Sequence, residues 1–410
     1  MSSLESVVIV GASLAGMHAA HTLRREGFDG RVTVIDADPN TPYDKPPLSK
    51  QVLQGEWDVD RITLAAAKED LGLEWRLGHR ATSLDLSART VTINAGDGSP
   101  GEAVTYDGLL LATGASARRL PDTPDLAGIH VLRTLDDCLA LRTDLEAKPD
   151  RVVVIGAGFI GAEVASSARK RGLEVTLIEA LEVPLERALG RAMGLVAADI
   201  HRDHGVDVRL GVGVAGFDGT PGERVQGVRL SDGSVVAADV VVVGVGVAPN
   251  TGWLESSGLT IDNGIVCDAT LLAAPGVVAA GDIARWPSAR FGELLRIEHW
   301  ENAIQMGEAA ARRLLVADGD TPEVYDPVPW FWSDQYDRKI QLAGRSGPDD
   351  LVEVVHGSVE ERRFVALYGR GGKVVGVLGI NRPRHVMQLR QLVIDGAEWE
   401  SGLATARALT

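Results

Sequence analysis

Cysteine is scarce in this sequence, and no apolar run is long enough to cross a membrane. The 410 residues include only two cysteines, Cys138 and Cys267, and no C-x-x-C pair. A disulfide framework and a cysteine-ligated iron–sulfur cluster are therefore excluded, and each cysteine is expected to be a small buried residue. A transmembrane helix needs roughly 20 consecutive apolar residues, which no stretch provides. The N-terminus also lacks the basic and apolar regions of a secretory signal, so a cytoplasmic location is expected.

Positive charge is in deficit as well. The chain has 41 Lys+Arg against 57 Asp+Glu, a net charge of −16 at pH 7. Because phosphate backbones are bound by basic surfaces, nucleic acid is not expected as a partner. A membrane is not expected either, because no apolar run is long enough to span one. A hydrophobic content of 45% with 24% charged residues is typical of a globular protein. The length suits two or three domains.

One βαβ pattern occurs twice in the sequence. Each copy has an apolar strand, a glycine-rich turn, a helix and a second strand that ends in an acidic residue. Such a repeat predicts an α/β fold with two doubly wound, Rossmann-like domains. The copies are expected over Ser6–Val10, Gly11–Gly16, Met17–Arg25 and Val32–Asp36, and over Arg151–Ile155, Gly156–Gly161, Ala162–Arg171 and Glu174–Glu179.

The second copy carries a complete dinucleotide-binding fingerprint, Gly156-Ala-Gly158-Phe-Ile-Gly161. Its glycines permit the tight turn, the approach of a pyrophosphate to the backbone, and close packing of the helix on the strand. The phosphates then meet the N–H groups at the start of the helix. Glu179 ends the next strand, where a carboxylate binds a ribose 2′-OH and repels a 2′-phosphate. The second copy therefore predicts a site for NADH.

The first copy reads Gly11-Ala-Ser13-Leu-Ala-Gly16, with Asp36 at the end of its second strand. Ser13 replaces the middle glycine and puts a Cβ where a pyrophosphate approaches, although its hydroxyl could itself bind phosphate. With Asp36 in place, a dinucleotide site is still favoured. Two such sites in one chain indicate a relay, in which a nicotinamide reduces a flavin that stays bound.

From about Pro327 the sequence changes to short strands followed by a helix near His385–Ile394, which predicts a third domain of α+β type. Residues 397–410 carry little pattern and are expected to be loosely held. The strands are expected at Ile340–Ala343, Val352–His356, Phe364–Tyr368 and Val374–Ile380. The predicted domains are an FAD-binding domain of residues 1–118 and 247–326, an NAD-binding domain of residues 119–246, and a C-terminal α+β domain of residues 327–410.

A set of short motifs resembles the NADH-dependent ferredoxin reductases of the glutathione-reductase-like fold, which supply oxygenases with electrons (the putidaredoxin-reductase type). Their joint order along nearly the whole chain is specific, although several are short. The motifs are Pro42-Tyr43-Asp-Lys-Pro46-Pro47-Leu48-Ser49-Lys50, Ala112-Thr113-Gly114, the second fingerprint with Glu163, Gly246-x-x-Pro249-Asn250, Ala280-Gly281-Asp282, His299-Trp300 and Phe331-Trp332-Ser333-Asp334-Gln335.

The resemblance implies roles for particular residues. Lys50 and Glu163 are the implied catalytic residues, an ion pair beside the flavin N5 atom. Asp282 is expected to bind the FAD ribityl chain from the start of the following helix, and Trp300 and Trp332 to flank the flavin ring, unless these two are core residues. The implied FAD residues are Gly11, Ser13, Leu14, Ala15, Gly16, Asp36, Lys45, Pro47, Lys50, Thr113, Gly114, Arg118, Gly281, Asp282, Glu298, His299, Trp300 and Trp332. The implied NAD residues are Gly156, Gly158, Phe159, Ile160, Gly161, Glu163, Glu179 and Gly246, and no metal ligands are expected.

The sequence departs from the family pattern at three positions and lacks one group that other members of the fold use. Ser13, Lys45 and Ala117 stand where the family usually has glycine, arginine and proline, which puts the strength of FAD binding in doubt. The stretch after Asp36 holds no cysteine, so a disulfide reductase or a thiol-dependent NADH oxidase is not expected. Electrons are expected to leave the flavin for a one-electron carrier.

The segment Arg362 to Arg390 holds seven basic residues and no acidic one. Two interpretations stay open at this point: a docking surface for an acidic iron–sulfur ferredoxin that passes electrons to an oxygenase, or a solvated sheet edge. Two other functions also stay open. One is a reductase of a small oxidant, similar to the monodehydroascorbate reductases, and the other is a redox-gated interaction protein similar to the apoptosis-inducing factors.

Overall fold

The structure is a computed structural model that describes residues 4–96, 100–317 and 319–409. The chain forms two compact units. The first unit contains the described residues of Met1–Asp44, Asp60–Ser116 and Ala248–Pro329, and the second those of Lys45–Val59, Ala117–Val247 and Trp330–Thr410. The short segment Lys45–Val59 therefore belongs to the second unit, although the first unit flanks it in sequence. The three predicted domain ranges stay a prediction.

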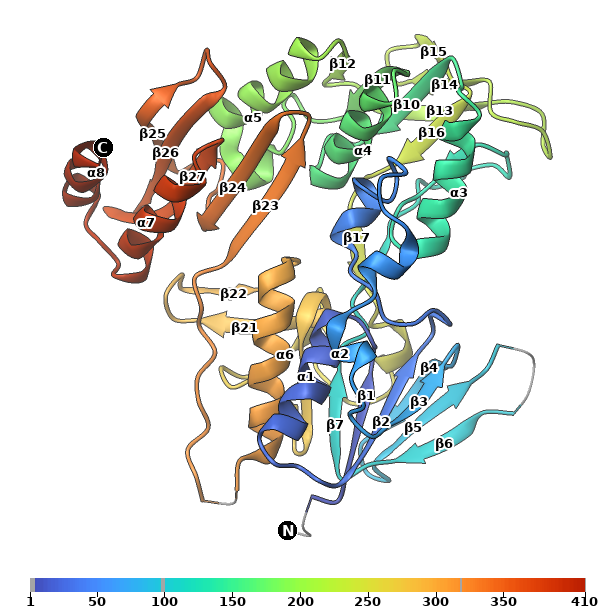
Figure 1. Ribbon diagram of the computed structural model, residues 1–410, viewed down its shortest axis with the longest axis vertical. Helices are drawn as coiled ribbons and strands as arrows, with labels where there is room; N and C mark the ends of the chain where they lie inside the picture. Colours follow the sequence, from blue (N-terminus) through green and yellow to red (C-terminus); the bar gives the residue numbers. More distant parts are fainter. Residues whose placement is uncertain (1–3, 97–99, 318, 410) are drawn as a thin grey trace. The chain divides into compact units, whose positions relative to one another are not determined.

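The first unit is built on a sheet with strand order β19-β20-β7-β1-β2-β3 (Figure 1). Strand β1 pairs in parallel with both β2 and β7, and all of its residues are buried, as expected of a strand covered on both faces. Helices α1 and α6 pack closely against each other. Gly307 of α6 makes this possible, because a Cβ at this position would collide with the backbone of Ala15 in α1. The elements of this sheet and its helices are β1 Ser6–Val10, α1 Leu14–Arg25, β2 Arg31–Asp36, β3 Leu73–Leu77, β7 Gly108–Leu111, β19 Leu272–Ala274, β20 Val277–Ala279 and α6 Trp300–Leu315.

Smaller elements complete the first unit. An antiparallel sheet is formed by β4 Arg80–Asp85, β5 Thr90–Asn94 and β6 Glu102–Thr105, and a second small sheet by β18 Ile265–Val266, β21 Ala284–Ser288 and β22 Glu293–Leu295. The short helices are η2 Val59–Ile62, α2 Ala65–Lys68, η3 Gly252–Leu254 and η4 Gly281–Ile283. Strands β8 Ala115–Ala117 and β17 Val247–Pro249 pair with each other.

The second unit repeats the parallel architecture in a sheet of order β12-β11-β10-β16-β9. Strand β10 pairs in parallel with β11 and β16, as β1 does with its neighbours in the first unit. The predicted α/β class with two Rossmann-like sheets is therefore confirmed. The elements of this part are η1 Pro46–Ser49, β9 Ile129–His130, α3 Leu135–Glu146, β10 Arg151–Ile155, α4 Phe159–Lys170, β11 Glu174–Glu179, α5 Glu186–Asp203, β12 Asp207–Leu210, β13 Val214–Asp218, β14 Gly227–Leu230, β15 Val235–Ala237 and β16 Val240–Val243.

The rest of the second unit is an antiparallel sheet of order β23-β24-β27-β26-β25 with two helices, so the predicted α+β character of the C-terminal part is also confirmed. The buried side chains of this sheet form one hydrophobic cluster with residues of α5. Its elements are β23 Trp330–Gln335, β24 Arg338–Gly344, β25 Leu351–Ser358, β26 Arg363–Arg370, β27 Lys373–Ile380, α7 Pro383–Ile394 and α8 Trp399–Ala408.

The expectation that residues 397–410 are loosely held is wrong for the described part of that segment. Residues Trp399–Ala408 form helix α8, in which Leu403 and Ala406 are buried. The Trp399 ring lies against Gly369, where any Cβ would collide with it. The apolar face of α8 is built from small residues and one leucine, so its helical period is weak in the sequence.

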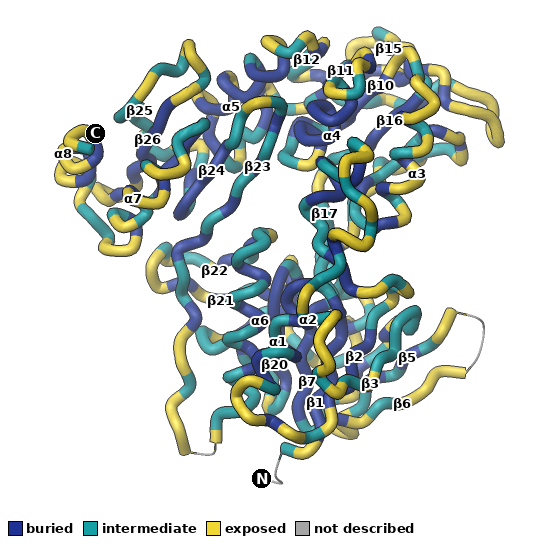
Figure 2. Tube along the Cα trace, viewed as in Figure 1, coloured by how far each residue is buried: buried dark blue, intermediate teal, exposed yellow. Residues whose placement is uncertain are grey.

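Figure 2 shows buried backbone running along the central strands of both units. Each parallel sheet thus forms the interior of its part of the chain. In the described ranges, no helix combines the length and apolar character needed to cross a bilayer.

Candidate functional site

The first glycine-rich turn connects β1 to α1. Gly11 has a φ of +113°, and a Cβ on it would collide with the carbonyl oxygen of Ala112. A Cβ on Gly16 would collide with the carbonyl oxygen of Gly11, so both positions require glycine. Ser13 stands just before α1 with extended backbone, which a serine adopts without strain. The turn therefore tolerates the departure from glycine at this position.

An acidic residue from the second strand is held against each of the two turns. Asp36, at the end of β2, accepts a 2.5 Å hydrogen bond from the N–H of Ala12. Glu179, at the end of β11, accepts a 2.8 Å hydrogen bond from the N–H of Ala157. Ala12 and Ala157 occupy the same place in the two fingerprints. Both carboxylates are therefore fixed where the ribose of a dinucleotide bound at the turn would lie.

The second glycine-rich turn connects β10 to α4 and leaves space for a ligand. A Cβ on Gly161 would collide with the carbonyl oxygen of Gly156, so the protein's own packing requires glycine there. Gly158 differs, because a Cβ on it would meet no atom within 4 Å. Open space in front of this glycine is where a pyrophosphate is expected at the start of the helix. The residues of this turn thus fit a dinucleotide, and the side chain of Ile160 is partly exposed beside them.

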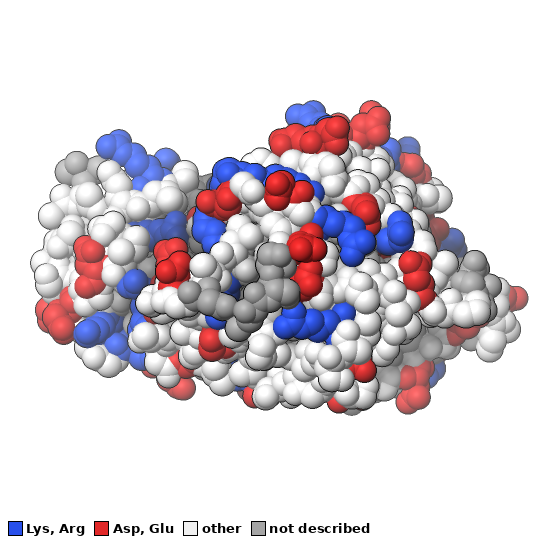
Figure 3. All heavy atoms as spheres, turned by 90° about the horizontal axis from the view of Figure 1, so that it is seen from below, with Lys and Arg blue, Asp and Glu red and all other residues white. Residues whose placement is uncertain are grey.

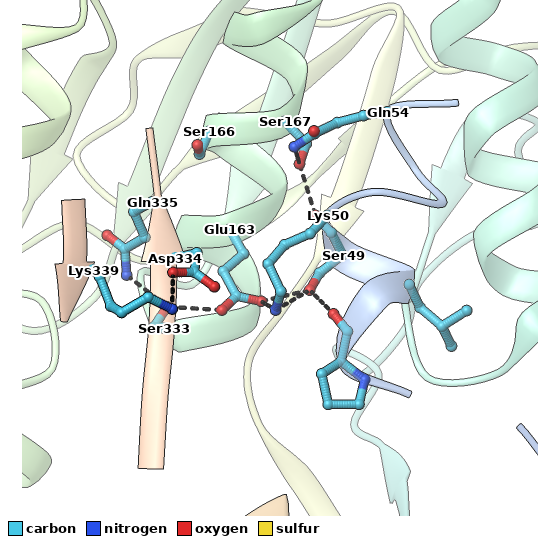
Figure 4. Close-up of polar contacts among 12 residues, drawn as sticks. Ser49, Lys50, Gln54, Glu163, Ser166, Ser167, Ser333, Asp334, Gln335 and Lys339 are labelled. Atoms are coloured by element: carbon cyan, nitrogen blue, oxygen red, sulfur yellow. Dashed lines mark hydrogen bonds and ion pairs between the residues drawn. The ribbon is translucent and has the colours of Figure 1, made fainter. Parts of the chain in front are cut away.

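A buried ion pair lies in the second unit (Figure 4). The Nζ atom of Lys50 lies 2.7 Å from Oε2 of Glu163, and the two residues are only 8% and 6% exposed. Lys50 follows the short helix η1, whereas Glu163 lies in the second turn of α4. Charged groups are buried in this way when each has a partner and further hydrogen bonds. The structure therefore brings together the two residues predicted to be catalytic.

Two serines complete the hydrogen bonding of the Glu163 carboxylate. Ser49 Oγ donates to Oε2 at 2.5 Å, and Ser333 Oγ donates to Oε1 at 2.8 Å. Ser333 in turn accepts a 3.1 Å hydrogen bond from the Nε2 atom of Gln335. None of these three residues was given a role from the sequence. All three lie inside the motifs that carry the family resemblance, and this position is the only indication in the sequence that they belong to the site.

The segment that carries Lys50 is fastened to α3 and α4. Ser167 of α4 donates a 2.7 Å hydrogen bond to the carbonyl of Ser49, and Arg171 donates to the carbonyl of Leu53 through two nitrogens. The thiol of Cys138 in α3 lies 3.1 Å from the carbonyl of Leu48. These contacts explain why this short segment packs as part of the second unit. They also fix Lys50 in relation to the helix that carries Glu163.

Several residues predicted to bind FAD lie in the first unit. Asn250 donates a 2.8 Å hydrogen bond to the carbonyl of Thr113 and a 3.0 Å bond to that of Gly114, which joins two of the motifs. The indole of Trp300, at the start of α6, donates to Asp44 at 2.7 Å. His299 stands directly before this helix as its N-cap. These hydrogen bonds therefore connect motifs that are far apart in the sequence.

Asp282, another residue predicted to bind FAD, lies in the first turn of the short 3-10 helix η4, which is followed by β21. Its contact with the cofactor stays a prediction. Gly281 beside it has a φ of +76°, so the chain makes a sharp turn there. Arg296 donates a 3.0 Å hydrogen bond to the carbonyl of Asp282 and pairs with Glu298 at 2.6 Å. Strand β21 begins at Ala284, so η4 ends after Ile283.

The remaining residues predicted to bind FAD lie in the second unit. The exposed side chain of Arg118 donates a 2.9 Å hydrogen bond to the carbonyl of Val247, and its backbone N–H donates to Gly246. Trp332 is stacked on Trp330, with ring centroids 5.3 Å apart. Lys45 and Pro47 lie at the start of η1. Their contacts with a cofactor stay a prediction.

Both cysteines are buried, as the sequence predicts. Burial raises the pKa of each thiol, Cys138 and Cys267, to about 12. Neither thiol is therefore a nucleophile near neutral pH. Among the described residues, no group of three or more His, Cys, Asp and Glu side chains is arranged to hold a metal ion.

The basic segment Arg362 to Arg390 is divided between two ends of the C-terminal sheet. In the antiparallel pair β26 and β27, Phe364 lies opposite Ile380 and Arg370 lies opposite Lys373. Residues near 363 and 382 are therefore at one end of the sheet, and residues near 370 are at the other. The sequence could not show this division, because it depends on the strand register.

Part of this positive charge is neutralised by the chain itself. Arg362 pairs with Asp199 and Asp203 at 3.1 Å, and Arg370 pairs with Asp350 at 2.7 Å. Arg363 and Arg384, at the first end of the sheet, are exposed and have no ion pair among the described residues. On the face drawn in Figure 3, basic and acidic side chains are interspersed, so that face carries no single large patch of either sign.

Comparison with known families covers nearly the whole chain. Residues 5–307 match the pyridine nucleotide-disulphide oxidoreductase family, and residues 330–408 match the reductase C-terminal family. The chain therefore belongs to the pyridine nucleotide-disulphide oxidoreductases, with a reductase C-terminal domain.

Full-length relatives confirm the resemblance to ferredoxin reductases. The chain is 38% identical to rhodocoxin reductase of Rhodococcus erythropolis over 95% of this chain and 89% of that protein. It is 34% identical to putidaredoxin reductase of Pseudomonas putida over 98% of this chain and 95% of that protein. The crystal structure of the covalent putidaredoxin reductase–putidaredoxin complex matches with a TM-score of 0.90 at 33% identity, covering 99% of both chains.

Proposed function

We propose that this chain takes hydride from NADH through a bound FAD and passes single electrons to an iron–sulfur ferredoxin that supplies a monooxygenase or dioxygenase. The observation that carries the proposal is the buried Lys50–Glu163 pair, found in a chain with full-length ferredoxin reductase relatives. Another relative, 36% identical, is the ferredoxin reductase component of a chlorobenzene dioxygenase. A cytoplasmic location stays a prediction.

The nicotinamide nucleotide is proposed to bind at the second turn. The N–H groups at the start of α4 would hold its phosphates, and the space in front of Gly158 would admit them. Glu179 would accept hydrogen bonds from the ribose hydroxyls, and its charge would repel the 2′-phosphate of NADPH. Phe159, Ile160 and Gly161 belong to the same proposed site.

The first turn is proposed to hold FAD, with Asp36 on the ribose of its adenosine part. When bound, FAD supplies acceptance of a hydride from NADH and release of electrons one at a time. The fit of Gly11, Gly16 and Asp36 to a dinucleotide supports this assignment. The other FAD residues named from the resemblance keep their proposed roles.

The charge on Lys50 gives the pair its proposed catalytic role. An ammonium group near the reacting centre stabilises the negative charge that develops there as hydride is transferred. Glu163 holds this ammonium in one position through a charge-assisted hydrogen bond. Because both groups are buried, the interaction is weakly screened by solvent.

The state of the cysteines supports a one-electron acceptor. Both thiols are buried with raised pKa values, so neither can relay electrons as a thiolate. The proposed docking surface for the ferredoxin is the end of the C-terminal sheet that carries Arg363, Arg382 and Arg384. Positive charge there would steer an acidic ferredoxin toward the protein.

Anaerobic stopped-flow measurements with the FAD-loaded enzyme test the proposal. Rapid reduction of the flavin by NADH is expected, followed by reduction of cytochrome c only when a [2Fe–2S] ferredoxin from a panel that includes putidaredoxin is added. Equal cytochrome c reduction without any ferredoxin would overturn the proposed acceptor. Efficient turnover with monodehydroascorbate would support the small-oxidant reductase instead. Slow accumulation of a stable reduced complex coupled to dimerisation would support the interaction protein.

A further inference from the structure

We propose that Ser333 of the C-terminal sheet is a positioning residue, which orients the Glu163 carboxylate so that its other oxygen faces Lys50. This inference rests on the proposed function, because it concerns how the proposed catalytic pair is held. It adds a residue from a different part of the fold to that pair.

The geometry of the carboxylate carries the first step. Glu163 accepts hydrogen bonds on both oxygens: Oε2 from Lys50 and Ser49, and Oε1 from Ser333 at 2.8 Å (Figure 4). The terminal torsion of a glutamate is broad, so contact at one oxygen leaves the carboxylate plane free to turn. A donor on the second oxygen fixes that plane. Ser333 is the donor on that oxygen among the described contacts.

The surroundings of Ser333 carry the second step. Its side chain is fully buried, and its oxygen accepts a hydrogen bond from Gln335 Nε2 at 3.1 Å. A serine hydroxyl has one hydrogen to donate. Because the amide of Gln335 is already a donor to this oxygen, that hydrogen is directed to Glu163. Gln335 therefore supports the direction of the Ser333 hydrogen bond.

A second contact sets the position of β23 on α4. The N–H of Tyr336, just after β23, donates a 2.6 Å hydrogen bond to Ser166 Oγ. Glu163 and Ser166 are three residues apart in α4, so they lie on one face of the helix. Strand β23 is thus bonded to α4 at two successive positions of that face. The orientation of Glu163 consequently depends on the C-terminal sheet, which also carries the proposed docking surface.

The test uses the FAD-loaded enzyme with Ser333→Ala, Glu163→Gln, the double variant and a control. The control is Ser346→Ala, because Ser346 is also buried and donates to a backbone carbonyl, that of Ala188, instead of to Glu163. Each protein is measured in two ways: the limiting rate of flavin reduction and the dissociation constant for NADH by stopped flow, and the flavin midpoint potential at equilibrium.

Ser333→Ala is expected to lower the limiting rate about tenfold, the effect of losing a hydrogen bond to a charged group, with the NADH dissociation constant changed less than about twofold. The flavin midpoint potential of Ser333→Ala is expected to be lower by about 30 mV, because this is the shift of a two-electron couple whose reduced state is stabilised tenfold less. In the Glu163→Gln background the serine replacement is expected to add less than about twofold. Ser346→Ala is expected to leave rate and potential unchanged.

Three results would overturn the positioning role. The first is an unchanged rate and potential in Ser333→Ala. The second is a loss of rate on adding Ser333→Ala to Glu163→Gln that equals its loss in the wild-type background, and the third is the same loss of rate in Ser346→Ala. The Glu163→Gln enzyme separates this inference from the proposed function. If that enzyme is slow while Ser333→Ala is normal, the inference about Ser333 alone fails. If Glu163→Gln is as fast as the wild type, the proposed role of the pair fails, and the inference fails with it.

Discussion

The Nζ atom of Lys50 and the Oε2 atom of Glu163 lie 2.7 Å apart in an interior where each residue is less than 10% exposed. The segment that carries Lys50 reaches this position because α3 and α4 bind its backbone carbonyls. A buried pair of this kind is costly to break, because the remaining charge keeps its desolvation penalty without its partner. The contact therefore affects both stability and the proposed chemistry.

Lys50→Met is expected to slow flavin reduction by NADH about 100-fold, because it removes the charge that stabilises the transition state. It is also expected to lower the free energy of unfolding by about 3 kcal/mol, because Glu163 stays buried without its cation. Stopped-flow spectroscopy and denaturant titration measure the two effects. The matched control is Lys170→Met, which breaks the exposed Lys170–Glu56 pair and should cost under about 1 kcal/mol. Wild-type reduction by the Lys50→Met enzyme would contradict the role of the ammonium.

Glu179→Ala is expected to lower kcat/KM for NADH about tenfold, because a charge-assisted hydrogen bond to the ribose is lost. The preference for NADH over NADPH should shrink at the same time, since the repulsion of the 2′-phosphate is removed. Steady-state kinetics with both nucleotides measure the two effects. Glu174→Gln is the control, because Glu174 is an exposed residue at the opposite end of the same strand. If the NADH preference stays unchanged in Glu179→Ala, the carboxylate does not select the nucleotide.

The parallel sheets could be predicted from the sequence because their central strands are short continuous apolar runs. Ser6–Val10 and Arg151–Ile155 form β1 and β10 with the predicted bounds. A glycine-rich turn and a helix follow each strand directly, so the information is local. The matches to known families confirm the assignment that these patterns suggested.

Strand β23 could not be predicted in the same way. Its buried face carries Phe331, Ser333 and Gln335, two of which are polar, and the larger apolar side chains Trp330 and Trp332 are on the other face. The polar residues are buried because they bond to each other and to Glu163, which is far away in sequence. The Lys50 segment likewise lies in the second unit because residues far away in the sequence, in α3 and α4, bind its backbone carbonyls. Both features depend on contacts that no local pattern records.

The residue at position 13 tests how the first turn compensates for the missing glycine. If the hydroxyl of Ser13 binds phosphate, Ser13→Ala should weaken FAD binding about tenfold or more, because a hydrogen bond to a charged group is worth about 1.5–3 kcal/mol. Ser13→Gly loses the hydroxyl but also removes the Cβ, so it should bind FAD more tightly than Ser13→Ala. Titration of the apoprotein with FAD gives the affinities. Equal affinity of Ser13→Ala and the wild type would mean that the hydroxyl makes no contact with the cofactor.

Charge reversal distinguishes a docking surface from a solvated sheet edge. Arg363→Glu and Arg384→Glu are expected to lower the rate of ferredoxin reduction about tenfold or more at low salt, since steering by complementary charge raises association rates. Reduction of a small dye by NADH should not change. Lys373→Glu is the matched control, because it makes the same charge change at the opposite end of β27. An equal loss in all three variants, or equal salt responses for ferredoxin and dye, would favour the solvated edge.

The buried histidine of α5 gives the protein a stability that depends on pH. His201 is almost fully buried, and its Nδ1 atom lies 2.8 Å from the hydroxyl of Tyr336. Burial, with a smaller contribution from His204, lowers the pKa of His201 from 6.5 to about 4. Burial also raises the pKa of Tyr336, so its hydroxyl stays protonated and donates to the neutral imidazole. The folded state therefore holds His201 without a proton at pH values where the unfolded chain binds one.

The sign of the effect follows from this difference in proton binding. As the pH falls below about 6.5, the unfolded state gains a proton that the folded state does not accept, so stability is lost until the pH reaches about 4. At about 1.36 kcal/mol per pKa unit, the whole loss amounts to roughly 3 kcal/mol. His201→Gln should remove this part of the pH dependence, so its melting temperature should fall less between pH 7 and pH 4.5 than that of the wild type. His21→Gln on α1, whose side chain is partly exposed, should keep the wild-type response. If His201→Gln and the wild type lose the same number of degrees over this range, His201 does not titrate on unfolding as proposed.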